Sequence, residues 1–143
     1  MTEAAASLPP GQGELLVVDD EPFLREAVAA SLRFLGFEVT TAENGAGALR
    51  LARDRPFDLV VLDVMLPDTD GFEVARRLTA AQGQPGGRGQ PGPVIVLTST
   101  REASDYGGRI AASPAAGFLP KDQLSARALR GYLDGGGLNG EPA

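Results

Sequence analysis

The chain has 143 residues, of which 43% are hydrophobic and 22% charged, and its formal net charge is −6 at pH 7. These values predict one soluble globular domain with a buried core, and the acidic balance argues against a nucleic-acid-binding surface. The chain contains no cysteine and no histidine, which excludes disulfides, thiolate and imidazole metal ligands, and phosphohistidine formation on this chain. No apolar run approaches the roughly 20 residues of a membrane span and no signal peptide is seen, so the cytoplasm is the expected location.

Five short apolar runs predict β-strands. The three strongest, at residues 15–18, 59–62 and 94–97, are uninterrupted Val, Leu and Ile, as expected for strands that are buried on both faces of a parallel sheet. The predicted strands cover residues 14–18, 37–41, 58–63, 93–97 and 117–119.

Helical patterns follow the strands in alternation. Pro22 suits the first turn of a helix, Asn44 can cap the next helix, and Asp70 with Glu73 has the spacing of a capping box. The fourth helix is weak because two adjacent glycines interrupt it. The predicted helices cover residues 22–35, 44–55, 70–81, 105–112 and 123–133.

The alternation of strands and helices predicts an α/β fold with a parallel sheet and helices on both faces. The domain is expected at residues 14–133, between an Ala/Pro/Gly-rich arm at 1–13 and a Gly-rich tail at 134–143. Residues 83–92 contain five glycines and two prolines and are interpreted as a flexible insertion between the third helix and the fourth strand. They lack the Gly-Lys-Ser/Thr ending of a phosphate-binding loop.

Three carboxylates follow predicted strand ends. Asp19 and Asp20 come directly after the first strand, and Asp63 closes the third. The carboxyl ends of parallel strands meet at the sheet edge where open α/β folds hold their sites. Carboxylates gathered there repel by on the order of 4 kcal/mol per close pair at an effective dielectric of about 20, so a cation is expected. All-oxygen ligands favour Mg²⁺ or Mn²⁺. The alternative is that Asp19 and Asp20 only cap the first helix.

Three further residues lie near predicted strand ends. Lys121 follows the fifth strand and is the only lysine beside 12 arginines; its flexible ammonium can reach an anion beside Asp63, although a solvated surface lysine is the alternative. Thr98 closes the fourth strand, where a hydroxyl can donate to a phosphoryl oxygen, but threonine often ends a strand. Phe118 by itself is more typical of a core side chain.

Together these pieces resemble the receiver domain of two-component response regulators, of the stand-alone, chemotaxis-regulator-like type. The matching stretches are Asp-Asp at 19–20, Leu-Val-Val-Leu-Asp at 59–63 with Pro67 and Gly71, Val-Ile-Val-Leu-Thr-Ser at 94–99 and Gly-Phe-Leu-Pro-Lys at 117–121. The resemblance covers residues 14–133. It implies a flavodoxin-like five-stranded parallel sheet of order 2-1-3-4-5, with five helices on two faces.

The resemblance also implies a chemical role for the acidic residues. Asp63 would be the phosphoacceptor, and Asp19, Asp20, Asp63 and the backbone carbonyl of Met65 would hold Mg²⁺. Phosphoryl transfer depends on positioning and charge neutralisation more than on covalent chemistry, which agrees with such a site.

Further roles implied by the resemblance concern signalling. Thr98 and Lys121 would contact the phosphoryl group, and Phe118 would be the switch aromatic. A sensor histidine kinase or a histidine phosphotransfer protein would supply the phosphoryl group. An unidentified downstream protein would read the face formed by the fourth helix, fifth strand and fifth helix, without direct nucleic-acid or membrane binding. Such a chain is not an enzyme, beyond catalysing its own phosphorylation and dephosphorylation.

Three other functions fit parts of the pattern. A receiver-like interaction module acting without phosphorylation would not need the complete set of acidic residues, Thr98 and Lys121. A Mg²⁺-dependent phosphohydrolase of similar topology would carry an aspartate two positions after its nucleophile, where this chain has Met65. A flavodoxin-like electron carrier would have uncharged donors after the first strand, where this chain has Asp-Asp-Glu.

Overall fold

The computed structural model describes residues 13–82 and 92–134. The arm, the insertion and the tail expected from the sequence therefore lie outside the described residues, apart from the one residue of each that adjoins the domain. No helix in the described ranges is long and apolar enough to cross a membrane.

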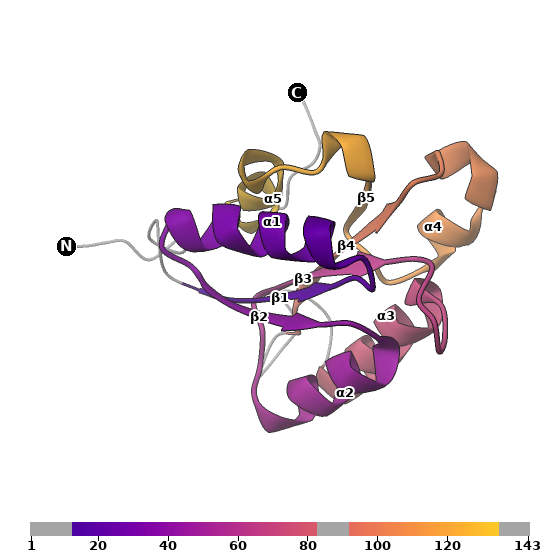
Figure 1. Ribbon diagram of the computed structural model, residues 1–143. Helices are drawn as coiled ribbons and strands as arrows, with labels where there is room; N and C mark the ends of the chain where they lie inside the picture. The colour runs from indigo at the N-terminus through magenta and orange to yellow at the C-terminus, as the bar shows by residue number, and fades with distance from the viewer. Residues whose placement is uncertain (1–12, 83–91, 135–143) are drawn as a thin grey trace.

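Five parallel strands form a single sheet in the order β2-β1-β3-β4-β5 (Figure 1). The α/β class and the strand order are thus confirmed. The strands are β1 (Glu14–Val18), β2 (Glu38–Ala42), β3 (Leu59–Asp63), β4 (Val94–Ser99) and β5 (Gly117–Pro120).

Helices cover both faces of the sheet. Figure 1 shows α1 and α5 together on one face, and α2 and α3 on the other. The short α4 lies near α3. The described residues form five α-helices, as predicted: α1 (Pro22–Phe34), α2 (Gly45–Asp54), α3 (Gly71–Gln82), α4 (Arg109–Ala112) and α5 (Ala126–Leu133). Two 3₁₀ turns, at Ala103–Tyr106 and Lys121–Gln123, flank β5 in sequence.

The boundaries differ from the predictions mainly after β4. The last helix begins at Ala126 rather than at Gln123, because Ser125 accepts the N–H of Ala128 at 3.1 Å and so acts as the N-cap. The weak fourth helix is broken as predicted, at Gly107, whose φ is 59°. β4 also runs on to include the polar residues after its apolar run.

Side-chain caps start two helices near the places predicted. Asn44 Oδ1 accepts the N–H of Gly47 at 2.7 Å, and Asp70 Oδ1 accepts the N–H of Glu73 at 2.9 Å. The Glu73 carboxylate pairs instead with arginines of its own helix, including Arg77 at 2.7 Å. A single acceptor, rather than the predicted reciprocal capping box, therefore opens α3.

The central strands are buried on both faces. Leu16 and Val60 belong to a cluster packed under α2 and α3, whereas Leu15 and Val61 belong to a second cluster under α1 and α5. Every residue of β3 is buried. Because alternate side chains enter opposite cores, these strands can neither slip nor rotate, and the positions of their ends are fixed.

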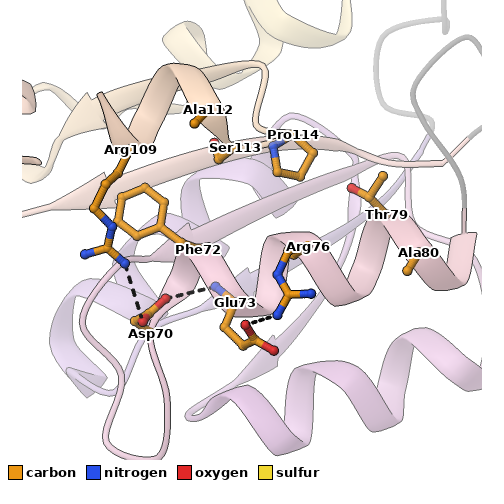
Figure 2. A pocket seen from close by; sticks show the side chains of 10 residues that line it. All are labelled: Asp70, Phe72, Glu73, Arg76, Thr79, Ala80, Arg109, Ala112, Ser113 and Pro114. Carbon is orange, nitrogen blue, oxygen red and sulfur yellow. Dashed lines mark hydrogen bonds and ion pairs between the residues drawn. The ribbon is translucent and has the colours of Figure 1, made fainter. Parts of the chain in front are cut away.

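A surface groove of about 730 Å³ lies between α3 and α4 (Figure 2). The Arg109 guanidinium lies over the Phe72 ring, 4.3 Å from its centroid, and 3.7 Å from the Asp70 carboxylate. A cation–π contact and an exposed ion pair are each worth only about 1 kcal/mol or less. These contacts therefore hold α4 weakly against α3.

Gly71 lets the start of α3 pack directly against the end of β3. Its N–H donates to the carbonyl of Val64 at 2.7 Å, and an added Cβ would lie 2.6 Å from the Asp63 carbonyl oxygen. Backbone atoms cannot move aside as a side chain can. We expect Gly71→Ala to lower the free energy of unfolding by about 1–3 kcal/mol, as measured by urea denaturation.

The matched control is Gly131→Ala. Gly131 lies within α5 and an added Cβ would meet open space, so we expect this variant to be more stable by about 0.5–1 kcal/mol. A Gly71→Ala variant as stable as the control would contradict the close approach of α3 to β3.

Candidate functional site

Three polar residues end neighbouring strands at one edge of the sheet. Asp19 directly follows β1, Asp63 is the last residue of β3, and Thr98 of β4 pairs in register with Asp63. Since β1, β3 and β4 are adjacent in the sheet, the fold brings these residues together as the sequence predicted.

The three predicted acidic residues form one cluster. Carboxylate oxygens of Asp19, Asp20 and Asp63 all lie within 4.8 Å of one another. Asp19 and Asp63 are only 2% and 3% exposed, whereas Asp20 faces solvent. The cluster therefore has a buried base and an open side, and its negative charges are close enough to repel one another.

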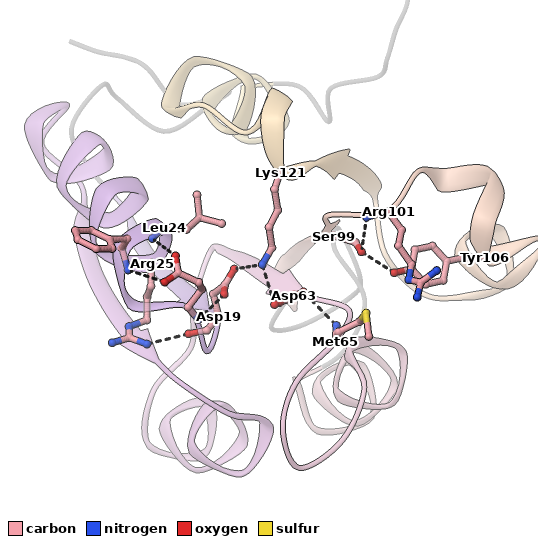
Figure 3. A network of polar contacts seen from close by, with 11 residues as sticks. Asp19, Leu24, Arg25, Asp63, Met65, Ser99, Arg101, Tyr106 and Lys121 are labelled. Atoms are coloured by element: carbon pink, nitrogen blue, oxygen red, sulfur yellow. Dashed lines mark hydrogen bonds and ion pairs between the residues drawn. The ribbon is translucent and has the colours of Figure 1, made fainter.

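Lys121 bridges the two buried carboxylates (Figure 3). Its Nζ lies 2.9 Å from Asp19 Oδ2 and 3.1 Å from Asp63 Oδ2. Burial alone lowers the pKa of Lys121, but its hydrogen bonds with both carboxylates outweigh this and raise the pKa above 10.5. The amine is thus positively charged at neutral pH, so the predicted placement of the lone lysine is confirmed.

Each buried carboxylate is held at both oxygens. Asp19 Oδ1 accepts the N–H of Glu21 at 2.8 Å, and Asp63 Oδ1 accepts the N–H of Met65 at 3.1 Å. The other oxygen of each carboxylate faces Lys121. This arrangement fixes the orientation of both groups and leaves their remaining lone pairs for a further ligand.

Burial dominates the electrostatics of Asp63. It raises the pKa of the carboxyl from 3.8 to about 6, with a further rise caused by Asp19, against the opposing effects of Lys121 and the Met65 N–H. At pH 7 the group is still mainly ionised. It is therefore a carboxylate that is poorly solvated and close to a cation, a state suited to a nucleophile.

Thr98 carries a buried hydroxyl without a partner. The residue is 1% exposed, and its Oγ1 has no hydrogen-bond partner among the described residues. An unsatisfied buried hydroxyl costs about 1–3 kcal/mol. Because Thr98 pairs in register with Asp63, this donor is in place for an anionic group bound near Asp63.

Phe118 lies farther along the same sheet edge, on β5. Its ring packs against Tyr106, with centroids 5.9 Å apart. Tyr106 in turn shares a hydrogen bond of 2.6 Å with Ser99. These contacts could not be predicted from the sequence, because Tyr106 lies in a Gly-interrupted segment without clear periodicity.

The donor set fits a hard divalent cation. Carboxylate oxygens make up the cluster, its open side leaves room for water ligands, and neither histidine nor cysteine occurs in the chain. Mg²⁺ prefers such oxygen ligands and retains several waters. Chemically, the site can combine a carboxylate nucleophile with an adjacent ammonium, a hydroxyl donor and a bound cation.

Comparison with known proteins identifies this arrangement. A family model described as the response regulator receiver domain matches residues 15–133. The chain is 43% identical over 104 residues to the probable transcriptional regulatory protein TcrX of Mycobacterium tuberculosis, an alignment that covers 72% of this chain and 40% of TcrX. The chain thus spans less than half the length of this relative.

Solved structures show the same similarity. The signal receiver domain of the putative response regulator NarL from Mycobacterium tuberculosis superposes with a TM-score of 0.72 at 28% identity, covering 89% of this chain and 98% of that one. The response regulator TrrA from Thermotoga maritima, solved in complex with Mg²⁺ and BeF, superposes with a TM-score of 0.63 at 32% identity, covering 75% and 84% of the two chains.

The raised pKa of Asp63 makes the stability of the metal-free protein depend on pH. Between about pH 4 and 6 the folded state retains a proton that the unfolded state has released, so the free energy of unfolding falls as pH rises through this window. We expect Asp63→Asn to remove this dependence. At pH 7 in EDTA it should raise the free energy of unfolding by about 1–3 kcal/mol, measured by urea denaturation.

Glu38→Gln serves as the control, because Glu38 is an exposed carboxylate at the start of the edge strand β2. We expect its stability to stay within about 0.5 kcal/mol of wild type at each pH. If Asp63→Asn instead lowered the free energy of unfolding at pH 7, the ionised Asp63 carboxylate would not destabilise the fold through its burial and its repulsion by Asp19.

Proposed function

The chain belongs to the response regulator receiver family, and within that family we propose that it is a phosphorylation-dependent signalling receiver with Asp63 as its phosphoacceptor. The observation that carries the proposal is the contact between the Lys121 amine and the buried carboxylates of Asp63 and Asp19. A receiver is a signalling phosphoacceptor rather than a true enzyme. The phosphoryl group is proposed to come from a phosphohistidine of a partner protein, since these 143 residues contain no histidine.

The proposed reaction is a single displacement at phosphorus. A carboxylate oxygen of Asp63 attacks, the P–N bond to the partner's histidine breaks, and the released imidazole nitrogen takes a proton from water. Lys121 neutralises part of the negative charge of the incoming phosphoryl group. The Thr98 hydroxyl, which has no partner among the described residues, donates a hydrogen bond to a phosphoryl oxygen. The proposed partner is a sensor histidine kinase or a histidine phosphotransfer protein. We expect the reaction to take place in the cytoplasm.

Mg²⁺ is the proposed cofactor. Asp19, Asp20, Asp63 and the backbone carbonyl of Met65 would hold it, supported by the mutual approach of the three carboxylates within 4.8 Å. When bound, the cation supplies charge neutralisation for the transferred phosphoryl group. The similarity to TrrA, which was solved with Mg²⁺ and BeF, supports the same choice.

Signal output is proposed to follow from a local change of charge. A phosphoryl group on Asp63 adds roughly −1 to −2 charge and new acceptor oxygens, which draw Thr98 inward. Phe118, as the proposed switch aromatic, then changes position, and a downstream protein reads the surface of α4, β5 and α5. The half-burial of Phe118 and β5 and the mainly exposed residues of α4 support a surface that can rearrange.

Phosphorylation is tested directly with acetyl phosphate and Mg²⁺. We expect the intact mass of the protein to show one added phosphoryl group, because Asp63 is the nucleophile with a charged amine 3.1 Å from it. Asp63→Asn should show none.

Glu38→Gln is again the control and should be labelled like wild type, because Glu38 lies away from the cluster on the edge strand. Labelling of Asp63→Asn to the wild-type level would refute the assignment of the phosphoacceptor. An unlabelled wild-type chain would favour the interaction module that acts without phosphorylation.

Magnesium binding is tested by thermal unfolding of the unphosphorylated protein. At a concentration ten times its Kd, Mg²⁺ should stabilise the fold by about 1.4 kcal/mol, which corresponds to a rise in Tm of roughly 4–8 °C for a domain of this size. Asp20→Asn keeps the contacts of Lys121 but removes one proposed ligand, so its Tm should respond much less. A wild-type Tm that does not change, with ionic strength held constant, would contradict the metal site.

A further inference from the structure

Ser99 and Tyr106 connect the acidic site to the segment that follows β4. The Ser99 and Tyr106 hydroxyl oxygens are 2.6 Å apart, and Ser99 Oγ also accepts the N–H of Arg101 at 3.0 Å (Figure 3). Ser99 is 1% exposed and comes directly after Thr98. A displacement of Thr98 therefore acts on this hydrogen bond through one peptide unit.

The Tyr106 ring carries the connection further. It packs against Phe118 with centroids 5.9 Å apart and against Phe72 edge-on with centroids 5.6 Å apart. Phe72 is also the ring beneath Arg109 of α4. One side chain thus joins the end of β4 to the proposed switch aromatic and to the wall of the groove shown in Figure 2.

Strand geometry shows why such a connection is needed. Thr98 pairs in register with Asp63 and Leu119, whereas Phe118 pairs with Leu97. Side chains on adjacent positions of a strand point to opposite faces of the sheet, so Thr98 and Phe118 lie on opposite faces. Ser99 is on the same face as Phe118, and Tyr106 connects the two by contacting both.

The segment around Tyr106 has little else to hold it. Neither the 3₁₀ turn Ala103–Tyr106 nor α4 contains a fully buried residue. Two glycines follow Tyr106, and an added Cβ at either would meet open space. Tyr106 and Ile110 are the side chains of this segment that pack partly against the core. A change at Tyr106 can therefore move the segment at low cost.

We propose that Tyr106 is a positioning residue that restrains the unphosphorylated state and couples Asp63 to Phe118 and α4. This inference rests on the proposed function. When a phosphoryl group on Asp63 draws Thr98 toward it, Ser99 moves with the strand and its hydrogen bond with Tyr106 breaks. The Tyr106 ring is then free to leave Phe118 and Phe72. The hydrogen bond belongs to the resting state, so its loss favours the activated state.

The test measures the affinity of the full chain for beryllium fluoride with Mg²⁺, a mimic of the phosphoryl group, by titration followed with NMR. Tyr106→Phe keeps the ring but removes the hydroxyl, and Ser99→Ala removes the other partner. We expect each variant to bind the mimic about 2- to 10-fold more tightly than wild type, the range that one hydrogen bond spans. The double variant should bind no more tightly than either single variant, because both remove the same bond.

Tyr132→Phe is the matched control, since it removes the hydroxyl of the other tyrosine, on α5. Its affinity for beryllium fluoride should equal that of wild type. The chain has two tyrosines and no tryptophan, so the fluorescence of Tyr132→Phe reports Tyr106 alone. We expect this emission to change on addition of beryllium fluoride, and the emission of Tyr106→Phe to change much less.

The outcomes separate the inference from the proposed function. A wild-type chain that does not bind beryllium fluoride overturns both. Wild-type binding with unchanged or weaker affinity in Tyr106→Phe and Ser99→Ala overturns the role of Tyr106 alone, even if the variants melt at a lower temperature. Additive gains in the double variant would overturn the shared hydrogen bond as the restraint.

Discussion

The ion contact between Lys121 and the two buried carboxylates is the interaction on which the site depends. Asp19 and Asp63 lie at the ends of adjacent strands, are nearly inaccessible to water, and would repel each other strongly without a cation between them. The amine at 2.9 and 3.1 Å reduces that repulsion, but burial and the nearby Asp19 together still raise the pKa of Asp63. The site therefore retains an unfavourable negative charge, which a bound divalent cation would relieve.

Such a cluster persists only because the surrounding fold is rigid. β1 and β3 place alternate side chains in two separate cores, and the direct contact of Gly71 with the end of β3 leaves no space for the strand to shift. Backbone N–H groups of Glu21 and Met65 then fix the outer carboxylate oxygens. The cost of assembling like charges is thus met by the burial of apolar surface elsewhere in the domain.

The segment that follows β4, beside the acidic site, is packed differently. Beyond β4 the chain forms a 3₁₀ turn, a four-residue α4 and a half-buried β5, none of which has a fully buried side chain. A rigid acidic site next to a weakly held segment is the arrangement that a receiver needs, because a small change of charge can move only a part of the structure that resists little. Tyr106 lies at the boundary between these two regions.

Residue patterns were sufficient for the fold class, for three of the five helix starts to within one residue, and for the convergence of Asp19, Asp20, Asp63 and Lys121. Apolar runs that end in charged residues are local signals, and parallel strands necessarily bring their carboxyl ends to one edge. Only the tertiary structure decided which carboxylates are buried, how Lys121 divides its contacts, and that Ser99 reaches Phe118 through Tyr106. Those facts depend on side-chain direction and packing between segments remote in the chain, for which a single sequence carries no periodic signal.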